Sequence, residues 1–338
     1  MATSDLDLLL VEYGQKKRDA EFALEKRKEK IYKKIPRLEE IDEQINKISI
    51  NKTKSILINK LTNSLNTEFE NDLMKLKEER KKILENEQID ESFFKPKYEC
   101  EKCKDTGYIT YSDKKTQMCN CLKQRLINIS YNKSNLSNLQ KENFKNFDIN
   151  RFSNEVNIEK YKMNISPREN IENIKKASQY FVKNFNNADV KNLFFTGNTG
   201  LGKTYMTNCI ANELIKQGKT VLYQTAPVLL ETIIDNKFNK YRNSSMSDFN
   251  NQVLKVDLLI IDDLGTECIN SMKISELFTI INARSLNLNN RVTKTIISTN
   301  LSIEKIFGVY EERIGSRIAG FYDIYYFFGE DLRLIKTN

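Results

Sequence analysis

Three of the chain's eleven glycines lie in one short segment that could bind phosphate. Glycines let successive backbone amides curl around a phosphate where a helix begins, while a lysine reaches the β and γ oxygens and a threonine hydroxyl holds magnesium. An apolar strand at 193–196 precedes the segment, and a helical pattern that Gly218 ends follows it. This order predicts a site for ATP or ADP with Mg²⁺. The segment reads Gly197, Asn198, Thr199, Gly200, Leu201, Gly202, Lys203 and Thr204.

Polar residues end two further apolar strands. Asp262 and Asp263 follow the run 256–261, and Asn300 follows 295–299. Because the carboxyl ends of parallel strands meet at one edge of a sheet, these side chains should face the phosphates. We expect Asp262 to bind magnesium through water and Asp263 to polarise the attacking water, with Glu267 as the alternative base. Asn300 would orient water or sense the γ-phosphate; a turn residue is the other interpretation of an asparagine at a strand end.

Two arginines near the C-terminus are suited to phosphate chemistry. Arg313 and Arg317 are four residues apart and so share one helical face, where they could reach the γ-phosphate of a neighbouring subunit. A surface salt bridge is the alternative interpretation of this pair. Arg333 ends the segment 329–333, which follows a last apolar strand at 325–328.

Four of the six cysteines fall at spacings typical of a metal site. Cys100 and Cys103 form one pair, and Cys119 and Cys121 form a second. The amino terminus lacks the basic region of a secretion signal, so we expect thiolates holding zinc rather than disulfides. The chain has no histidine, so the site must be all-cysteine, and a closed four-thiolate site serves folding. A redox dithiol is the competing interpretation.

The composition bounds the remaining possibilities. The absence of histidine excludes the Ser-His-Asp, Cys-His and His-ligated zinc mechanisms. Lys and Arg outnumber Asp and Glu by 54 to 46, a net charge of +8 that gives only a weak attraction to polyanions. No apolar run approaches the roughly 20 residues of a membrane span, so we expect a bacterial cytoplasmic protein without a membrane partner.

The first third of the chain should be helical. Between Gly14 and Gly107 no glycine occurs, and apolar residues recur at helical spacing from Leu38 to Leu76, including Leu61 and Leu65. Pro36 should separate two helices, and 51–53 should break the second from the third, giving a helical hairpin or small bundle. Such a region could be a self-contained bundle or a docking element for a partner.

These elements predict an α/β fold, a P-loop ATPase core with a parallel sheet, preceded by an all-α region and a small four-cysteine zinc module. We divide the chain into a helical region at 1–95, the zinc module at 96–127, a linker at 128–165 and the ATPase domain at 166–338. The linker contains Phe144, Phe147 and Phe152, which are apolar enough to dock onto the domain that follows.

The ordered motifs resemble those of the AAA+ ATPases, and more narrowly of the bacterial DnaC/DnaI-type replicative helicase loaders, with the transposition helper IstB as a close cousin. The resemblance covers roughly residues 97–338 and includes the cysteine cluster, the glycine-rich segment and the strands that end at Asp263 and Asn300. It implies that Arg317 is an arginine finger acting on a neighbouring subunit, with Arg313 as second choice. It also implies that Asn300 is a first sensor and Arg333 a second.

The resemblance further implies a function. Loaders of this family bind a hexameric replicative helicase, assemble next to it and place it on single-stranded DNA, and the helicase docks on the N-terminal region, here up to about residue 125. Many AAA+ proteins have glutamate where this chain has Asp263, so we expect slow, partner-regulated hydrolysis. Single-stranded DNA would contact the ATPase domain, although a solvated helix explains the same composition; the candidates are Lys237, Lys240, Tyr241 and Arg242.

Two other functions fit the same motifs. An IstB-like transposition helper would share nearly all of the core motifs, but it would have less need of a zinc module and a long helical N-terminal region. A non-hydrolysing adaptor would use the nucleotide for structure only.

Overall fold

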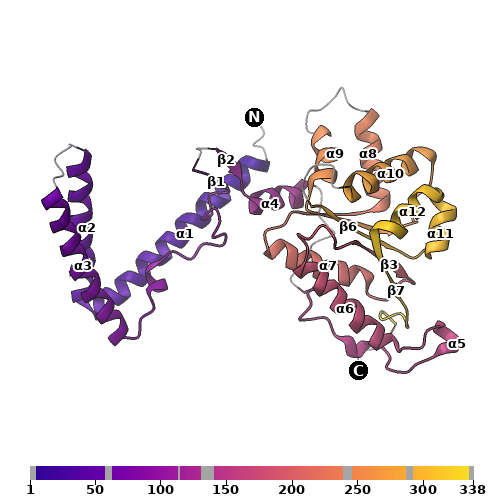
Figure 1. Ribbon diagram of the computed structural model, residues 1–338, viewed down its shortest axis with the longest axis horizontal. Helices are drawn as coiled ribbons and strands as arrows, with labels where there is room; N and C mark the ends of the chain where they lie inside the picture. Colours follow the sequence, from indigo (N-terminus) through magenta and orange to yellow (C-terminus); the bar gives the residue numbers. More distant parts are fainter. Residues whose placement is uncertain are drawn as a thin grey trace. The chain divides into compact units, whose positions relative to one another are not determined.

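The structure is a computed structural model, and it describes residues 5–57, 63–112, 115–130, 141–238, 246–286 and 292–334. The chain divides into two compact units, Met1–Cys119 and Asn120–Asn338. Figure 1 shows the elements of both. None of the described helices combines the length and the apolar character that crossing a membrane requires.

The first unit is helical, as predicted. It contains α1 (Asp5–Lys34), α2 (Pro36–Leu57), α3 (Asn63–Asn86), the short 3-10 helix η1 (Glu91–Phe94) and a hairpin of β1 (Tyr108–Thr110) and β2 (Thr116–Met118). Pro36 begins α2, where its fixed φ and missing amide hydrogen are tolerated. The predicted break at 51–53 is wrong, because α2 continues to Leu57 and these residues include neither glycine nor proline. Leu61 and Leu65 lie where the structure gives no account of side chains.

Helices α2 and α3 pack as an antiparallel pair. Arg37 pairs with Glu79 at 2.9 Å and Lys52 with Glu70 at 3.0 Å, so residue numbers rise along one helix as they fall along the other. A more buried network joins further elements: Asp42 on α2 accepts hydrogen bonds from the Tyr32 hydroxyl of α1 and from Nε of Arg80 on α3, each at 2.7 Å. Both partners contact Phe94 of η1.

The second unit is the predicted α/β fold with a parallel sheet. The five strands lie in the order β4-β5-β6-β3-β7, and every neighbouring pair is parallel. The unit contains α4 (Asn120–Ser130), η2 (Ile149–Arg151), α5 (Ile158–Tyr161), α6 (Pro167–Lys183), β3 (Asn192–Gly197), α7 (Lys203–Lys216), β4 (Val221–Thr225), α8 (Ala226–Phe238), α9 (Met246–Lys255), β5 (Leu258–Leu264), α10 (Ser271–Ser285), β6 (Lys294–Thr299), α11 (Ile303–Val309), α12 (Glu311–Phe321) and β7 (Tyr322–Phe327).

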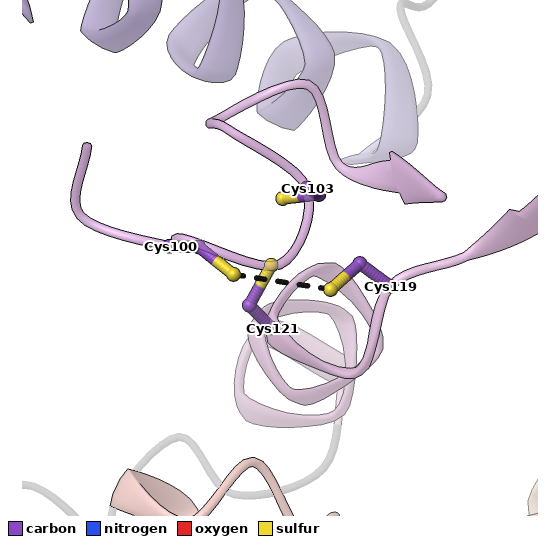
Figure 2. Close-up of side chains that lie close together, drawn as sticks. All are labelled: Cys100, Cys103, Cys119 and Cys121. Atoms are coloured by element: carbon purple, nitrogen blue, oxygen red, sulfur yellow. Dashed lines mark hydrogen bonds between the residues drawn. The ribbon is translucent and has the colours of Figure 1, made fainter. Parts of the chain in front are cut away.

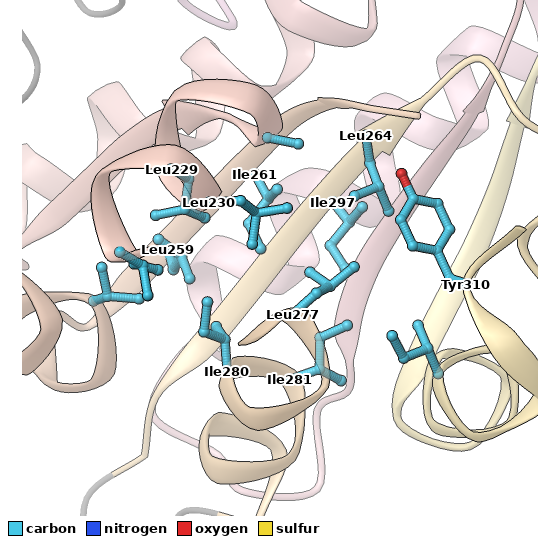
Figure 3. Close-up of a cluster of buried hydrophobic side chains, with 14 of the residues drawn as sticks. Leu229, Leu230, Leu259, Ile261, Leu264, Leu277, Ile280, Ile281, Ile297 and Tyr310 are labelled. Atoms are coloured by element: carbon cyan, nitrogen blue, oxygen red, sulfur yellow. The ribbon is translucent and has the colours of Figure 1, made fainter. Parts of the chain in front are cut away.

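Each face of the sheet has its own hydrophobic core. Strands buried on both faces read as continuous apolar runs, which explains why β3, β5 and β6 could be found in the sequence. One core lies against α8–α12, and Figure 3 shows its side chains, among them Leu229, Ile261, Leu277 and Tyr310. The other lies against α6 and α7. Helix α6 begins with a local signal: Ser166 caps it by accepting the amide hydrogen of Glu169 at 3.1 Å, and proline follows the cap.

The segment predicted to be a linker supplies part of the second core. Phe147 and Phe152 are buried, and Phe147 lies edge-on to Tyr205 of α7 with ring centroids 5.2 Å apart.

Helix α4 covers the outer edge of β4, where the Gln124 side chain accepts from Val221 N at 2.6 Å and donates to Val221 O at 3.0 Å. Residues 131–140 lie outside the described chain.

A buried arginine ties together the amino ends of the strands. Arg284 on α10 is 1% exposed, and its guanidinium donates to the Thr295 hydroxyl at 2.9 Å. It also donates to backbone carbonyls before β5 and at the start of β6, so its charge and its N–H groups are satisfied by oxygens. These carbonyls belong to Val253, Val256, Asp257 and Lys294.

Candidate functional site

The glycine-rich segment connects the end of β3 to the start of α7, as the sequence predicts. Gly197, Gly200 and Gly202 have φ values of +141°, +77° and +86°, which only glycine adopts readily. A Cβ on Gly197 would lie 2.1 Å from the carbonyl oxygen of Phe327. Asn198 and Thr199 are exposed at the loop, whereas Leu201 is buried. The glycines thus let the backbone turn sharply into α7, and the amides of a helix N-terminus can receive an anion.

Lys203 is held at the centre of this loop. Its Nζ donates to the carbonyls of Gly197 at 2.7 Å and Asn198 at 2.8 Å, and to Oδ1 of Asn300 at 2.7 Å. Burial lowers the pKa of Lys203, and the nearby carboxylates of Asp263 and Asp262 oppose that effect. The lysine thus links the end of β3 to the residue after β6, at the start of α7, where a helix N-terminus favours an anion.

Asp262, at the carboxyl end of β5, accepts four hydrogen bonds. Thr204 Oγ1 donates to Oδ2 at 3.1 Å and the amide of Asp263 to Oδ1 at 3.1 Å. The hydroxyls of Tyr223 and Ser298 donate to Oδ2 and Oδ1 respectively. A carboxylate and a threonine hydroxyl in contact are oxygen ligands of the kind that Mg²⁺ takes next to nucleotide phosphates, so these residues fit the ion.

Asp263 is positioned differently from its neighbour. Its φ of +55° lies in the left-handed region that non-glycine residues rarely adopt, and its side chain is only half-buried. Burial and the adjacent Asp262 raise the pKa of Asp263, while Lys203 and Arg333 lower it. Raised carboxylate pKa values are typical of groups that exchange protons at active sites.

Glu267, the alternative base, is engaged elsewhere. Its Oε2 accepts the amide hydrogen of Gly265 at 2.9 Å, and its Oε1 accepts the hydroxyl of buried Tyr310. Both oxygens hold the loop after β5 against α11 and α12, so Asp263 remains the better candidate for water activation.

The segment after β7 packs over the glycine-rich loop. Leu332 N donates to Gly200 O at 3.0 Å, and Arg151 donates to Leu332 O at 2.8 Å. The Asp331 carboxylate occupies the space that a Cβ on Gly200 would need. Arg333 follows directly, and its charge lowers the pKa of both Lys203 and Asp263, which places it within electrostatic range of the site.

The two candidate finger arginines lie on α12. Arg313 pairs with Glu311 at 2.8 Å and lies 4.8 Å from the ring centroid of Phe278. Arg317 lies 5.7 Å from the ring centroid of Phe321 and is partly exposed. The contacts of both arginines are therefore with residues of α10 and α12.

The candidate DNA contacts fall largely outside the described chain. Lys240, Tyr241 and Arg242 lie there, at 239–245. Lys237 is described, and its Nζ pairs with Glu276 Oε1 at 2.5 Å.

The four predicted metal-ligating cysteines converge. The sulfurs of Cys100, Cys103, Cys119 and Cys121 lie within 4.8 Å of one another, and Figure 2 shows them pointing toward a common centre. The Cys100 and Cys119 sulfurs are 3.9 Å apart. Four thiols at this separation could hold a metal ion, and their softness suits zinc.

Asp105 organises the loop that carries the first cysteine pair. It is 3% exposed, and its carboxylate accepts the amide hydrogens of Glu99 at 2.9 Å and Cys100 at 2.8 Å. Thr106 caps the turn by donating to Cys103 O at 2.6 Å. Gly107, at φ +77°, then starts the hairpin and accepts the amide hydrogen of Cys119 at 2.8 Å. This backbone geometry brings the second cysteine pair next to the first.

Sequence reasoning missed three residues of the nucleotide site. Tyr223 and Ser298 both contact Asp262, and Arg151 holds the segment that carries Arg333. The only available signal for Tyr223 and Ser298 is a hydroxyl inside an otherwise apolar strand. Arg151 gives no local signal, because its partner lies 181 residues away.

Comparison with known proteins identifies related chains. Residues 122–314 match the family described as IstB-like ATP binding protein. The chromosomal replication initiator DnaA of Buchnera aphidicola subsp. Cinara cedri is 33% identical over 138 residues, which are 40% of this chain and 30% of that protein. The replicative helicase loader DnaC of Escherichia coli K12 is 29% identical over 147 residues, 43% of this chain and 56% of that protein. The match thus spans under two thirds of either relative.

Solved structures were matched as well. A crystal structure of the DnaC helicase loader has a TM-score of 0.44 at 20% identity, covering 57% of this chain and 99% of that one. A crystal structure of DnaI has a TM-score of 0.42 at 22% identity, covering 58% and 92%.

The family match covers more than half of the chain and contains the phosphate loop, both aspartates and Asn300. The observed parallel sheet and loop agree with the predicted AAA+ P-loop architecture. The chain therefore belongs to the IstB-like ATP-binding proteins.

Proposed function

We propose that the protein is an ATP-dependent helicase loader, which binds the hexameric replicative DNA helicase and delivers it onto single-stranded DNA when replication starts. The observation that carries the proposal is the convergence of Lys203, Thr204, Asp262, Asp263 and Asn300 at one sheet edge, within a chain similar to a protein named replicative helicase loader. A loader of this kind would act in the bacterial cytoplasm.

Each residue of the site would have its own role in ATP binding and hydrolysis. Backbone amides of the 197–204 loop and Lys203 would bind the phosphates, and Thr204 with Asp262 would hold Mg²⁺, which neutralises charge on the phosphates when bound. Asp263 would accept a proton from water, and Asn300 would orient that water. The short side chain of Asp263 favours slow hydrolysis, which suits a switch that a partner regulates.

Other parts of the chain would serve assembly. Arg317, or else Arg313, would act on the nucleotide of a neighbouring copy beside the helicase, and Arg333 would sense the chain's own nucleotide. We propose a helical helicase-docking region at 1–95, a zinc module at 96–127, a linker at 128–165 and the ATPase domain at 166–338. Zinc on the four cysteines would stabilise the module that they close.

A second candidate function has one observation in its favour. The family matched by residues 122–314 is named for IstB, so a transposition helper ATPase fits the core equally well. ATP turnover separates the candidates when it is measured with and without single-stranded DNA and the replicative helicase. A loader should respond to the helicase, whereas a helper should not. A non-hydrolysing adaptor should show no turnover under any condition, and Lys203→Ala should leave its loading activity intact.

A further inference from the structure

Tyr223 is a buried tyrosine whose hydroxyl points into the nucleotide site. It lies at the middle of β4, is 3% exposed, and belongs to the hydrophobic core beside α7. Strand β4 is next to β5 in the sheet, and Thr225 lies opposite Asp262 in their register. A tyrosine on this strand can therefore reach sideways to the end of β5, where its hydroxyl donates to Asp262 Oδ2.

The carboxylate of Asp262 is held from three elements. Thr204 donates from the first turn of α7, Tyr223 from β4 and Ser298 from β6. The amide of Asp263 also donates, from β5, the strand that carries Asp262 itself. These donors reach both oxygens of the carboxylate, so they fix the rotation of the group and the oxygen that faces Thr204. Hydrogen-bonded partners that orient a ligating group commonly determine its metal affinity.

We propose that Tyr223 is a positioning residue for magnesium, which acts by holding Asp262 in the orientation that receives the hydrated ion beside Thr204. The inference rests on the proposed Mg–ATP site and extends it to a residue outside the phosphate loop and the β5 carboxylates. Ser298 supports the opposite oxygen of the same carboxylate. Without the Tyr223 hydroxyl, Oδ2 keeps, among the residues that the structure describes, only the Thr204 hydrogen bond, and the carboxylate can rotate away from the ion.

The test is the Mg²⁺ dependence of nucleotide binding in Tyr223→Phe, which removes the hydroxyl and retains the ring in the core. A fluorescent ATP analogue is titrated into the full-length protein over a series of Mg²⁺ concentrations and, separately, in EDTA. Loss of a group that orients a metal ligand typically weakens metal affinity by about tenfold or more. We expect the Mg²⁺ midpoint to rise about tenfold, with affinity in EDTA unchanged. Ser298→Ala should shift the midpoint in the same direction.

Tyr322→Phe is the matched control. Tyr322 is also a buried tyrosine of the sheet, but it begins β7, at the end of the parallel sheet opposite the nucleotide site. This variant should keep the wild-type midpoint. An unchanged or lower midpoint in Tyr223→Phe would overturn the inference, as would an equal loss of affinity with and without Mg²⁺. If the affinity of the wild type for nucleotide did not depend on Mg²⁺, the proposed Mg–ATP site itself would be overturned.

Discussion

Replacing Cys103 by serine removes one of the four clustered sulfurs and so tests whether the cluster binds zinc. In a regular tetrahedron, the 3.9 Å between the Cys100 and Cys119 sulfurs corresponds to a metal–sulfur distance of about 2.4 Å. Zinc–thiolate bonds are about 2.3 Å long, which places the sulfurs of a regular tetrahedron about 3.8 Å apart. The four sulfurs lie within 4.8 Å of one another, so the most widely separated would move together by up to about 1 Å on binding zinc. Structural zinc contributes roughly 10–16 kcal/mol in zinc-finger peptides. Shared among four ligands, that is about 3 kcal/mol for each thiolate, or on the order of a hundredfold in affinity.

The assay is metal analysis of the full-length protein purified without chelators. We expect one zinc per chain in the wild type and little in Cys103→Ser, because a neutral serine hydroxyl is a poor substitute for a thiolate. Titration of the wild type with a thiol reagent should release zinc as the cluster reacts. The matched control is Cys268→Ser, since Cys268 is exposed and lies outside the cluster. That variant should retain its zinc.

Two results would refute this reasoning. The first is a wild-type protein that contains no zinc and whose four cluster thiols alkylate freely. The second is a Cys103→Ser protein with wild-type zinc content, which would place the metal elsewhere.

Three further substitutions probe the second unit. Gly200→Ala should weaken nucleotide binding by about tenfold, because the alanine Cβ would lie 1.8 Å from Asp331 Oδ1 and because the φ of +77° at this position strains any residue with a side chain. Gly308→Ala is the control in the same titration, since its Cβ would meet no atom within 4 Å. Asp263→Asn should abolish hydrolysis but raise the melting temperature, because the raised pKa of this carboxyl means that its charged form destabilises the fold at neutral pH. For the same reason, wild-type hydrolysis should fall as the pH is lowered through a midpoint above the ordinary aspartate value of about 4. Arg284→Met should lower the free energy of unfolding by about 3 kcal/mol in a denaturant titration, because it leaves buried carbonyls unpaired; an unchanged unfolding midpoint would contradict this role.

The parts of the site that the sequence predicted are those encoded locally. The phosphate loop lies between an apolar strand and an amphipathic helix, and Asp262 and Asn300 each follow an apolar run. Such patterns depend on neighbours in the chain, so they can be identified without knowledge of the fold. The four cysteines were found for the same reason, since their spacing alone indicates a shared ligand.

The parts that were missed depend on contacts between distant segments. Tyr223 is separated from Asp262 by 39 positions, and Leu332 from Arg151 by 181. A tyrosine in a strand is ordinarily a core residue, so only the register of β4 with β5 reveals its partner. The predicted break at 51–53 is wrong because no residue there stops a helix, and α2 continues to Leu57.

Nucleotide-dependent capture of the helicase tests the central claim most directly. The full-length protein is immobilised and mixed with the replicative helicase of the same bacterium and single-stranded DNA, with ATP or without nucleotide. We predict that the wild type retains the helicase and transfers it to DNA only with ATP, and that Lys203→Ala fails to do so. Lys216→Ala, which changes an exposed lysine near the end of the same helix α7, should behave like the wild type. Failure of the wild type to retain the helicase, or normal transfer by Lys203→Ala, would contradict the proposed function.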